Sequence, residues 1–290
     1  MSNFVILTDS SADLGADMAR ELDIQVLPLS FIIDGQTYHN FPDNREMAPG
    51  EFYARLRQGD VATTAALNVA EYTEALEPLL QAGHDVLVLA FSSGLSTTYN
   101  SSLIAVQDLR EKYPDRKLYT VDTLCASLGQ GLLVYLAAKE REKGRSIEEV
   151  RDWVESSKLS ICHQFTVDDL HFLKRGGRIS ATTAVVGSML QIKPVLHVDD
   201  EGHLVNIAKA RGRQASLKAL VDKMEESAIH AADQTVFISH GDCLADAQSV
   251  ADLVRTRLGV KDIYINPIGP VIGAHSGPGT VALFYVGTKR

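Results

Sequence analysis

The run Val86-Leu-Val-Leu-Ala-Phe91 is apolar without a break, and the loop Ser92-Ser-Gly-Leu-Ser-Thr-Thr98 follows it directly. A helical pattern then extends over about 97–111. An unbroken apolar run of this length, followed by a polar loop, is typical of a strand with both faces buried. A buried strand that opens through a short loop into a helix indicates an α/β sheet.

The rest of the first half repeats this alternation. Asp34-Gly35 is a hairpin-turn signal, and Ser146 with Glu149 is a capping box at the start of a helix. Strands are expected at 4–7, 24–33 (one or two strands), 36–39, 86–91 and 118–121, and helices at 14–22, 52–57, 72–80, 97–111, 128–143 and 147–158. This order predicts a doubly wound, mostly parallel sheet.

The second half has a different pattern. Asp199-Asp200-Glu201-Gly202 is flanked by strands at 194–198 and 203–208, which indicates an antiparallel hairpin. A helix at 214–227, a strand at 235–239, a helix at 246–258 and strands near 263 and at 281–285 follow. These elements predict a smaller, mixed-sheet α/β domain. We place the domain boundary near Ser160, so that residues 1–160 and 161–290 form the two domains.

Composition excludes several classes of protein. A length of 290 residues with 45% hydrophobic content allows one large core or, more often, two. The net charge of −9 argues against a general binder of nucleic acid or anionic membranes. No apolar stretch approaches the roughly 18 residues of a membrane span, and the first residues lack a signal-peptide pattern. Three widely spaced cysteines fit a reducing cytoplasm.

The hydroxyl-rich loop is a candidate anion site. Ser92, Ser93, Ser96 and Thr98 lie where a strand ends and a helix begins. Free N–H groups and the helix dipole favour an anion at such a position. Ser96 is placed to be the N-cap, and capping alone is an equally good explanation of the loop.

Two other segments could reach the same edge of the sheet. Thr63-Thr64 precede a helix start with Asn68 as N-cap and Glu71 at the third position. Alone this pair is more often structural, but the loop Asp9-Ser10-Ser11 after the first strand also ends at a helix. His275 lies in a glycine-rich loop before the last strand, where it could approach a ligand or simply be exposed. The histidines show no metal-ligand spacing, so no metal is expected.

Two basic clusters stand out on an acidic chain, at 174–178 and 209–213. Each could bind phosphate or an acidic partner, although a solvated basic face is the usual explanation of such runs. The phosphate-binding loop, the dinucleotide fingerprint and the Gly-x-Ser-x-Gly elbow are all absent from the sequence. Their absence removes the commonest nucleotide-binding and hydrolase interpretations.

Taken together, these segments resemble the DegV family of bacterial fatty-acid-binding proteins. The matching segments, in chain order, are Thr8–Leu14, Pro28–Ser30, Thr64, Ser92–Ser96, Leu173–Ser180, Lys193-Pro194 and His275–Gly279. They cover nearly the whole chain. The resemblance implies a two-domain α/β protein that buries a long-chain fatty acid between or beneath its domains.

The resemblance also implies a set of ligand-binding residues. The family's carboxylate-binding threonine and serine correspond to Thr64 and Ser96, with Ser93 and His275 nearby. Two departures from the family pattern concern this set: Thr97 replaces the usual glycine after the serine, and Ala65–Asn68 replaces a common Ser-Gln-Pro-Ser. Burying an acyl tail is strongly favourable, at about 0.8 kcal/mol per CH₂, whereas the carboxylate needs hydrogen-bond donors.

Some family members are the binding subunits of a bacterial fatty acid kinase. By resemblance, the arginines that dock the kinase correspond to Arg178 and Arg211. The chain has no ATP-binding motif of its own, so we expect a cytoplasmic, non-enzymatic carrier with no cofactor other than its fatty acid. The alternative is a small-molecule hydrolase or phosphotransferase that uses Ser96 or Ser93 with His275 as base. Such a pair needs a third group to orient the histidine, and the sequence identifies none.

Overall fold

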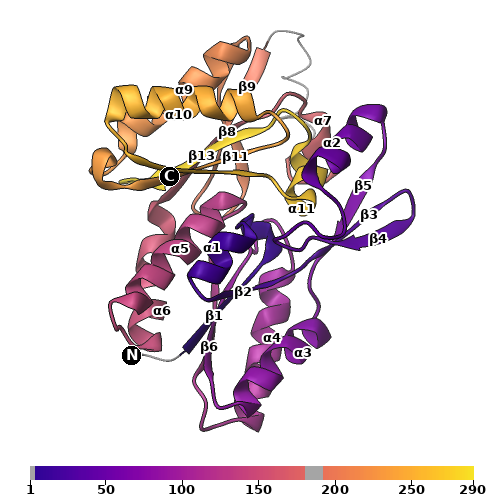
Figure 1. Cartoon of the computed structure of the whole chain (residues 1–290), viewed down its shortest axis with the longest axis vertical. Helices are drawn as coiled ribbons and strands as arrows, with labels where there is room; N and C mark the ends of the chain where they lie inside the picture. Colours follow the sequence, from indigo (N-terminus) through magenta and orange to yellow (C-terminus); the bar gives the residue numbers. More distant parts are fainter. Residues whose placement is uncertain (1–3, 180–191) are drawn as a thin grey trace.

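The computed structural model describes residues 4–179 and 192–290. Residues 1–3 and 180–191 lie outside it, and with them Ser180 of the expected motif. The expected α/β class is confirmed: a four-stranded parallel sheet and a separate six-stranded mixed sheet are stacked in one molecule (Figure 1). A third, three-stranded antiparallel sheet projects from the side of the stack.

The parallel sheet has the order β2-β1-β6-β7. Its strands are β1 (Phe4–Asp9), β2 (Ile24–Leu27), β6 (Asp85–Ala90) and β7 (Leu118–Asp122). Helices α3 (Val69–Gln81) and α4 (Thr98–Lys112) pack on one face. Helices α5 (Leu128–Glu142) and α6 (Ile147–Ser157) pack on the other, and α1 (Ala16–Glu21) lies beside β2. Helices on both faces make this a doubly wound sheet.

The mixed sheet has the order β10-β9-β8-β13-β11-β12. Its strands are β8 (Ile161–Thr166), β9 (Ile192–Val198), β10 (Leu204–Arg211), β11 (Thr235–His240), β12 (Asp262–Pro267) and β13 (Val281–Val286). Only the pair β11–β12 is parallel. Helices α9 (Arg213–Ser227) and α10 (Leu244–Leu258) cover the face away from the parallel sheet, above it in Figure 1.

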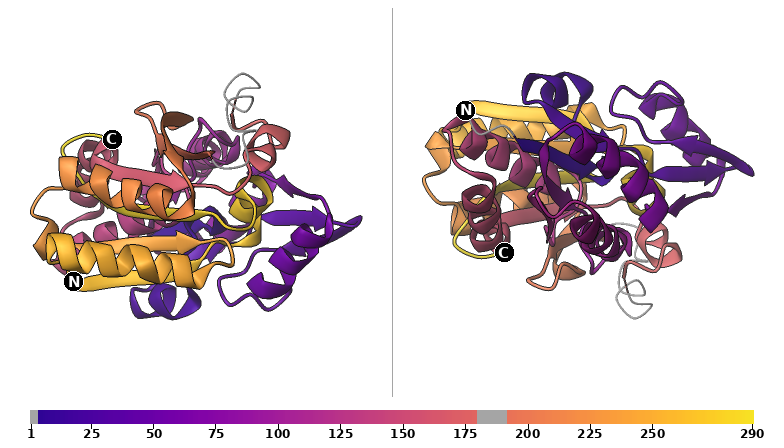
Figure 2. Two further views of the ribbon diagram at one scale, coloured as in Figure 1. Left: turned by 90° about the horizontal axis from the view of Figure 1, so that it is seen from above. Right: turned by 90° about the horizontal axis from the view of Figure 1, so that it is seen from below.

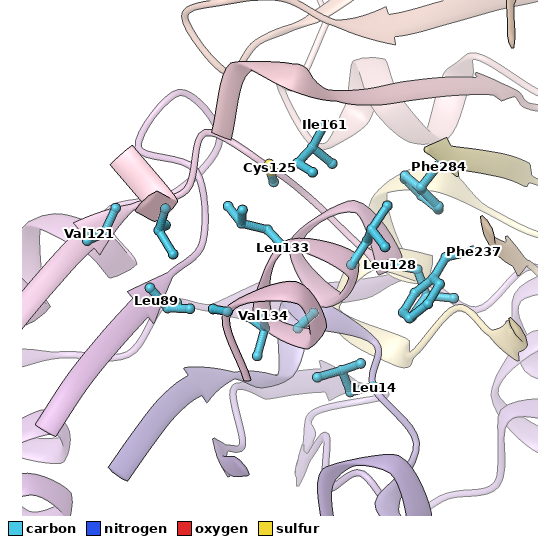
Figure 3. Packing of buried hydrophobic residues seen from close by; sticks show 14 of the residues in the cluster. Leu14, Leu89, Val121, Cys125, Leu128, Leu133, Val134, Ile161, Phe237 and Phe284 are labelled. Atoms are coloured by element: carbon cyan, nitrogen blue, oxygen red, sulfur yellow. The ribbon is translucent and has the colours of Figure 1, made fainter. Parts of the chain in front are cut away.

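Helix α5 is buried between the two large sheets. It contacts β1 on one side and β8, β11 and β13 on the other, and ten of its fifteen residues are buried. Figure 3 shows Leu128, Leu133 and Val134 of this helix between Leu89 of β6 and Phe284 of β13. The expected division at residue 160 falls just before β8, yet the largest apolar cluster crosses it. The two halves therefore share this cluster, while further clusters lie within the second half and mainly within the first.

The three-stranded sheet has the order β4-β3-β5. Its strands are β3 (Ser30–Ile33), β4 (Gln36–His39) and β5 (Ala62–Ala65), and α2 (Pro49–Gln58) packs against them. The predicted hairpin turn is confirmed, since Asp34 and Gly35 both have positive φ, at 52° and 72°. The expected strand at 24–33 is two strands, which belong to different sheets.

Two short helices lie where the three sheets meet. They are α7 (His171–Arg175) and α11 (Pro270–Ser276), and they pack against each other. The views from above and below in Figure 2 place the three-stranded sheet to one side of both large sheets. Three single-turn 3₁₀ helices complete the described elements, at Ser10–Ala12, Lys158–Ser160 and Ala231–Asp233.

Candidate functional site

A cavity of about 390 Å³ lies between the mixed sheet and the ends of the parallel strands. This volume falls in the usual range for small-molecule sites, roughly 300–1,000 Å³. Of the residues that the sequence proposed as functional, five line the cavity: Thr64, Ser93, Ser96, Arg178 and His275. Arg211 does not.

The polar side chains of Thr64, His275 and Arg178 gather at one end of the cavity beside apolar residues of α11, and the walls along the mixed sheet are mainly apolar. Its polar end is formed where α11 packs against β5 and α7. Away from that end its walls include Phe165, Val198, Leu204 and Phe284. His163 also lies in this wall, but both of its ring nitrogens are hydrogen-bonded to backbone groups and burial holds its pKa well below the usual value. The apolar end therefore carries no charge.

The hydroxyl-rich loop contributes Ser96 to the polar end. The Ser96 Oγ lies 2.9 Å from the Thr98 hydroxyl and accepts the backbone N–H of Thr98 at 3.2 Å. The helix begins at Thr98, with Thr97 as the flanking residue, whose side chain makes no capping bond. The expected N-cap position is therefore wrong by one residue. Ser96 nevertheless supplies the capping hydrogen bond and also faces the cavity.

The other serines of the loop have different places. Ser92 is buried: its hydroxyl donates to the carbonyl of Gly202 at 2.9 Å and accepts the N–H of Gly94 at 3.2 Å. It therefore fixes the loop against the β9–β10 hairpin. Ser93 lies on the cavity wall and is exposed. Its backbone N–H donates a hydrogen bond to the Asp122 carboxylate at 3.1 Å. Only Ser93 and Ser96 of this loop's serines reach the cavity.

Thr64 reaches the cavity from a strand that the sequence analysis missed. It lies on β5, where it pairs with Phe31 of β3. Successive side chains of a strand point to opposite faces, so Thr64 is half-buried on the cavity wall while Thr63 is exposed. The capping box of Asn68 and Glu71 is confirmed at the helix start that follows.

His275 lies on a helix, so its expected position in a loop is wrong. Helix α11 begins with Pro270 at its first position and ends before Gly277, whose φ is 77°. Proline at the start and glycine after the end is a known helix signal. The internal Gly273 is required by packing, because a Cβ there would lie 2.5 Å from the Tyr53 hydroxyl.

Helix α11 places the imidazole of His275 in hydrogen-bond contact with the hydroxyl of Thr64. The Nε2 atom of His275 and the Oγ1 atom of Thr64 are 2.8 Å apart. The Nδ1 atom is buried and has no hydrogen-bond partner among the described residues. It faces the backbone of Gly176, where a Cβ would lie only 2.2 Å away. Neither Ser93 nor Ser96 bonds to the imidazole, so the alternative catalytic pair is not formed among the described contacts.

Burial, together with the positive charges of Arg178 and Arg175, lowers the pKa of His275 to about 4. The imidazole is therefore neutral at physiological pH. A neutral imidazole carries one N–H donor and one acceptor. The charge at this end of the cavity comes from Arg178 instead.

Arg178 follows α7 and is half-buried on the cavity wall. Its Nε and Nη2 atoms donate to the Leu95 carbonyl at 3.2 and 3.0 Å, and Nη1 donates to the Gly176 carbonyl. No carboxylate lies within ion-pair distance of it among the described residues, and the rest of the chain contains no Asp or Glu. Burial lowers its pKa from the usual value. Arg178 is thus a half-buried cation without a counter-ion among the described residues, and its expected role in docking a kinase stays a prediction.

Arg211 does not line the cavity. It is the last residue of β10, the edge strand of the mixed sheet, and its side chain is exposed. Of the two arginines that the family resemblance assigned to docking, only Arg178 lies on the cavity wall.

The family departure at Thr97 leaves the loop unstrained. Thr97 has φ −78° and ψ 0°, a conformation open to any residue, so no glycine is needed there. Several polar residues of the wall were not expected from the sequence, among them Thr280 and, at the start of α5, Ser127. Its hydroxyl donates to the buried carboxylate of Asp13 at 2.5 Å, and the Gly269 N–H donates to the same carboxylate at 2.9 Å. Burial raises the pKa of Asp13 to about 8.

Comparison with known proteins agrees with this architecture. A family model described as "Uncharacterised protein, DegV family" matches residues 3–288. A DegV domain-containing protein of Clostridium perfringens is 50% identical over 290 residues, covering 100% of this chain and 99% of the relative. The chain belongs to the DegV family.

Solved DegV structures share the fold of this DegV protein. A DegV lipid-binding protein of Thermotoga maritima superposes with a TM-score of 0.87 at 30% identity and covers 100% of both chains. A DegV family protein of Thermus thermophilus, described as binding fatty acid, has a TM-score of 0.84 at 29% identity, with 98% and 99% of the two chains covered. Bound lipid is thus a property of relatives with the same fold.

Two further observations bear on the ligand class. Within residues 4–179 and 192–290, no cluster of three or more His, Cys, Asp or Glu side chains could hold a metal ion. No helix of the described chain is long and apolar enough to cross a bilayer.

Proposed function

We propose that this DegV protein is a cytoplasmic carrier that buries the tail of a long-chain fatty acid in its cavity. The observation that carries this proposal is the polarity of the cavity, which is apolar along the mixed sheet and polar where Thr64 meets His275. Apolar burial gains about 0.8 kcal/mol per CH₂. The carboxylate then lies at Thr64 and Ser96, flanked by Ser93. The fatty-acid and lipid binding of relatives with this fold supports the same ligand class.

The contact between Thr64 and His275 suits an anionic headgroup. A carboxylate only accepts hydrogen bonds, so the Thr64 hydroxyl must donate its proton to the ligand. Its oxygen can then accept the Nε2–H of His275, which leaves Nδ1 unprotonated against the backbone of Gly176. His275 acts through Thr64, as a positioning residue that sets the direction of the hydroxyl. A neutral imidazole is suited to this role.

Arg178 supplies the charge that the ligand neutralises. Among the described residues, its bonds to Leu95 and Gly176 use three of its five N–H groups. A charged side chain that is half-buried without a counter-ion is costly, and a carboxylate at the polar end lowers that cost. We therefore propose that Arg178 binds the carboxylate of the ligand and does not dock the kinase.

We also propose that the bound acid is presented to a separate kinase, which forms the acyl phosphate. Arg211 remains the candidate docking residue for that partner, because its side chain is exposed at a sheet edge. An exposed cation on a protein of net charge −9 favours an acidic partner surface. The sequence holds no ATP-binding motif, which supports a carrier.

Lipid analysis and titration test the ligand class. Mass spectrometry of an organic extract of the purified protein should detect a fatty acid in amounts comparable with the protein. Delipidated protein should bind palmitate more tightly than hexadecanol, which has the same tail and no charge. At a hundredfold excess over its dissociation constant, palmitate should stabilise the fold by about 2.7 kcal/mol.

The outcomes separate the carrier from an enzyme. Equal affinities for palmitate and hexadecanol contradict a carboxylate site at Thr64 and Ser96. An empty protein that hydrolyses p-nitrophenyl acyl esters, and loses this activity in Ser96→Ala or Ser93→Ala, supports the hydrolase instead.

A further inference from the structure

The guanidinium of Arg290 cross-links three separate segments of the chain. Its acceptors are the carbonyl oxygens of Leu124 (2.7 Å), Lys158 (2.8 Å), Asp199 (2.9 Å) and Ile161 (3.2 Å) and the sulfur of Cys125 (3.0 Å). A guanidinium has five N–H donors, so these five contacts account for all of them. None of the acceptors carries a charge. Arg290 is therefore bound by backbone geometry rather than by an ion pair.

Each of the three segments continues into the cavity wall. The turn that holds Asp199 joins Val198 to Leu204, and both of these residues line the cavity. The loop after β7 continues into Ala126, which also lines it. Strand β8 reaches the wall at His163, whose Nε2 accepts the Ala126 N–H at 3.2 Å. The contacts of Arg290 thus lie directly behind one end of the cavity.

That end is the one farthest from His275. Strand β13 begins just after α11, where Thr280 donates to the Ser276 carbonyl at 2.9 Å. From there it runs antiparallel to β8, so that Phe284 lies opposite His163. At roughly 3.3 Å per residue, Phe284 is about 13 Å along the strand from Thr280. The cavity wall therefore runs from the polar end at α11 toward the cross-link made by Arg290.

We propose that Arg290 closes the end of the cavity that receives the acyl tail, and so sets the longest fatty acid that fits. This inference rests on the proposed function. A tail too long for the cavity would have to displace a guanidinium whose donors are all in use. Displacement would leave several part-buried carbonyls without their partner, which is unfavourable. Arg290 touches no ligand headgroup, so its effect is on length and not on charge.

The test compares the affinities of saturated acids of about ten to twenty carbons for the delipidated protein. In the unaltered protein, affinity should rise by roughly a factor of four for each added methylene while the tail is buried. It should then fall at the length at which the tail meets Arg290. In Arg290→Ala the affinity should rise with chain length as in the unaltered protein, but for the longest acids it should level off instead of falling. Arg290→Lys offers three donors from a single nitrogen, so its fall should be shallower than that of the unaltered protein.

Arg141→Ala is the matched control. Arg141 also donates to several backbone carbonyls, including that of Phe4 at 3.1 Å, but it lies away from the cavity. Its loss should lower stability without changing the length profile. A fall that persists in folded Arg290→Ala, or one that also disappears in Arg141→Ala, overturns the inference.

A second variant does not depend on the folding of Arg290→Ala. Val198→Phe places a larger side chain inside the same end of the cavity. The affinity should therefore begin to fall at a shorter acyl chain than in the unaltered protein. A length profile unchanged in Val198→Phe overturns the inference. An unaltered protein that binds the acids without any fall over this range overturns it while leaving the proposed function intact. Failure of all the acids to bind overturns both.

Discussion

The hydroxyl oxygen of Thr64 and the Nε2 atom of His275 lie 2.8 Å apart, although 211 positions separate them in the chain. Thr64 is on a strand of the three-stranded sheet, and His275 is on a short helix that packs against that strand. The contact therefore depends on how the C-terminal half sits on this small sheet. Changes at either residue report on the polar end of the cavity.

Thr64→Val removes one hydroxyl while keeping the shape of the side chain. Because a hydrogen bond to a charged group is worth about 1.5–3 kcal/mol, palmitate affinity should fall tenfold or more. Ser96→Ala should have a similar effect. Titration of delipidated protein measures both. Thr63→Val is the matched control, since Thr63 is exposed, and a loss of affinity equal to that of Thr64→Val would falsify the assignment.

His275 should make stability depend on pH. Its pKa is about 4 in the folded protein and 6.5 in its ordinary state, so the unfolded chain takes up a proton first as the pH falls. The stability due to neutral His275 is present above pH 6.5 and is lost as the pH falls toward 4. Denaturant unfolding over this range should show the unaltered protein losing stability relative to His275→Gln. Parallel pH profiles of stability for the unaltered protein and His275→Gln contradict the prediction.

Asp13 should act in the opposite sense. Burial raises its pKa from 3.8 to about 8, so the folded state holds this proton more tightly than the unfolded chain. Its contribution to stability is fully present below pH 3.8 and is lost as the pH rises to about 8. The melting temperature of Asp13→Asn should therefore rise relative to the unaltered protein between pH 4 and 8. A difference in melting temperature that stays constant over this range would show that Asp13 does not titrate in this way.

Arg178 and Arg211 should separate ligand binding from partner docking. Arg178→Gln removes the only cation described on the cavity wall and should weaken palmitate binding about tenfold or more. Arg211→Glu should leave palmitate affinity unchanged and reduce acyl-phosphate formation in a mixture reconstituted with the kinase. Normal turnover with Arg211→Glu argues against docking at this residue. Full palmitate affinity in Arg178→Gln returns that residue to the surface role expected from the sequence.

Local signals predicted much of the fold. The capping boxes at Asn68 and Ser146 and the turn at Asp34 depend on neighbouring residues only, and all three are present. Strand β5 was missed because Ala-Thr-Thr-Ala is short and polar, so only its pairing with β3 makes it a strand. Helix α11 was missed because Gly273 disfavours a helix in isolation, whereas packing against Tyr53 requires it.

Less of the candidate site than of the fold could be predicted from the sequence. The family resemblance placed Thr64, Ser96 and His275 together, and the structure brings all three to one cavity. The docking role of Arg178 came from the family resemblance and stays a prediction, whereas its place on the cavity wall depends on the distant Leu95 carbonyl, which no local pattern indicates. The apolar walls come from strands of the mixed sheet that are far apart in the chain. No local pattern marks such residues as neighbours.

The place of β13 in the mixed sheet has a consequence for synthesis on the ribosome. This strand lies between β8 and β11, yet it is made after both of them. Until residues 281–286 emerge, β8 and β11 lack their common neighbour, and one side of the apolar helix α5 stays uncovered. Nascent chains with exposed apolar surface and unpaired strand edges are prone to aggregate. A chain that ends before β13 should therefore depend on chaperones to stay in solution, whereas a chain that includes β13 should fold without them.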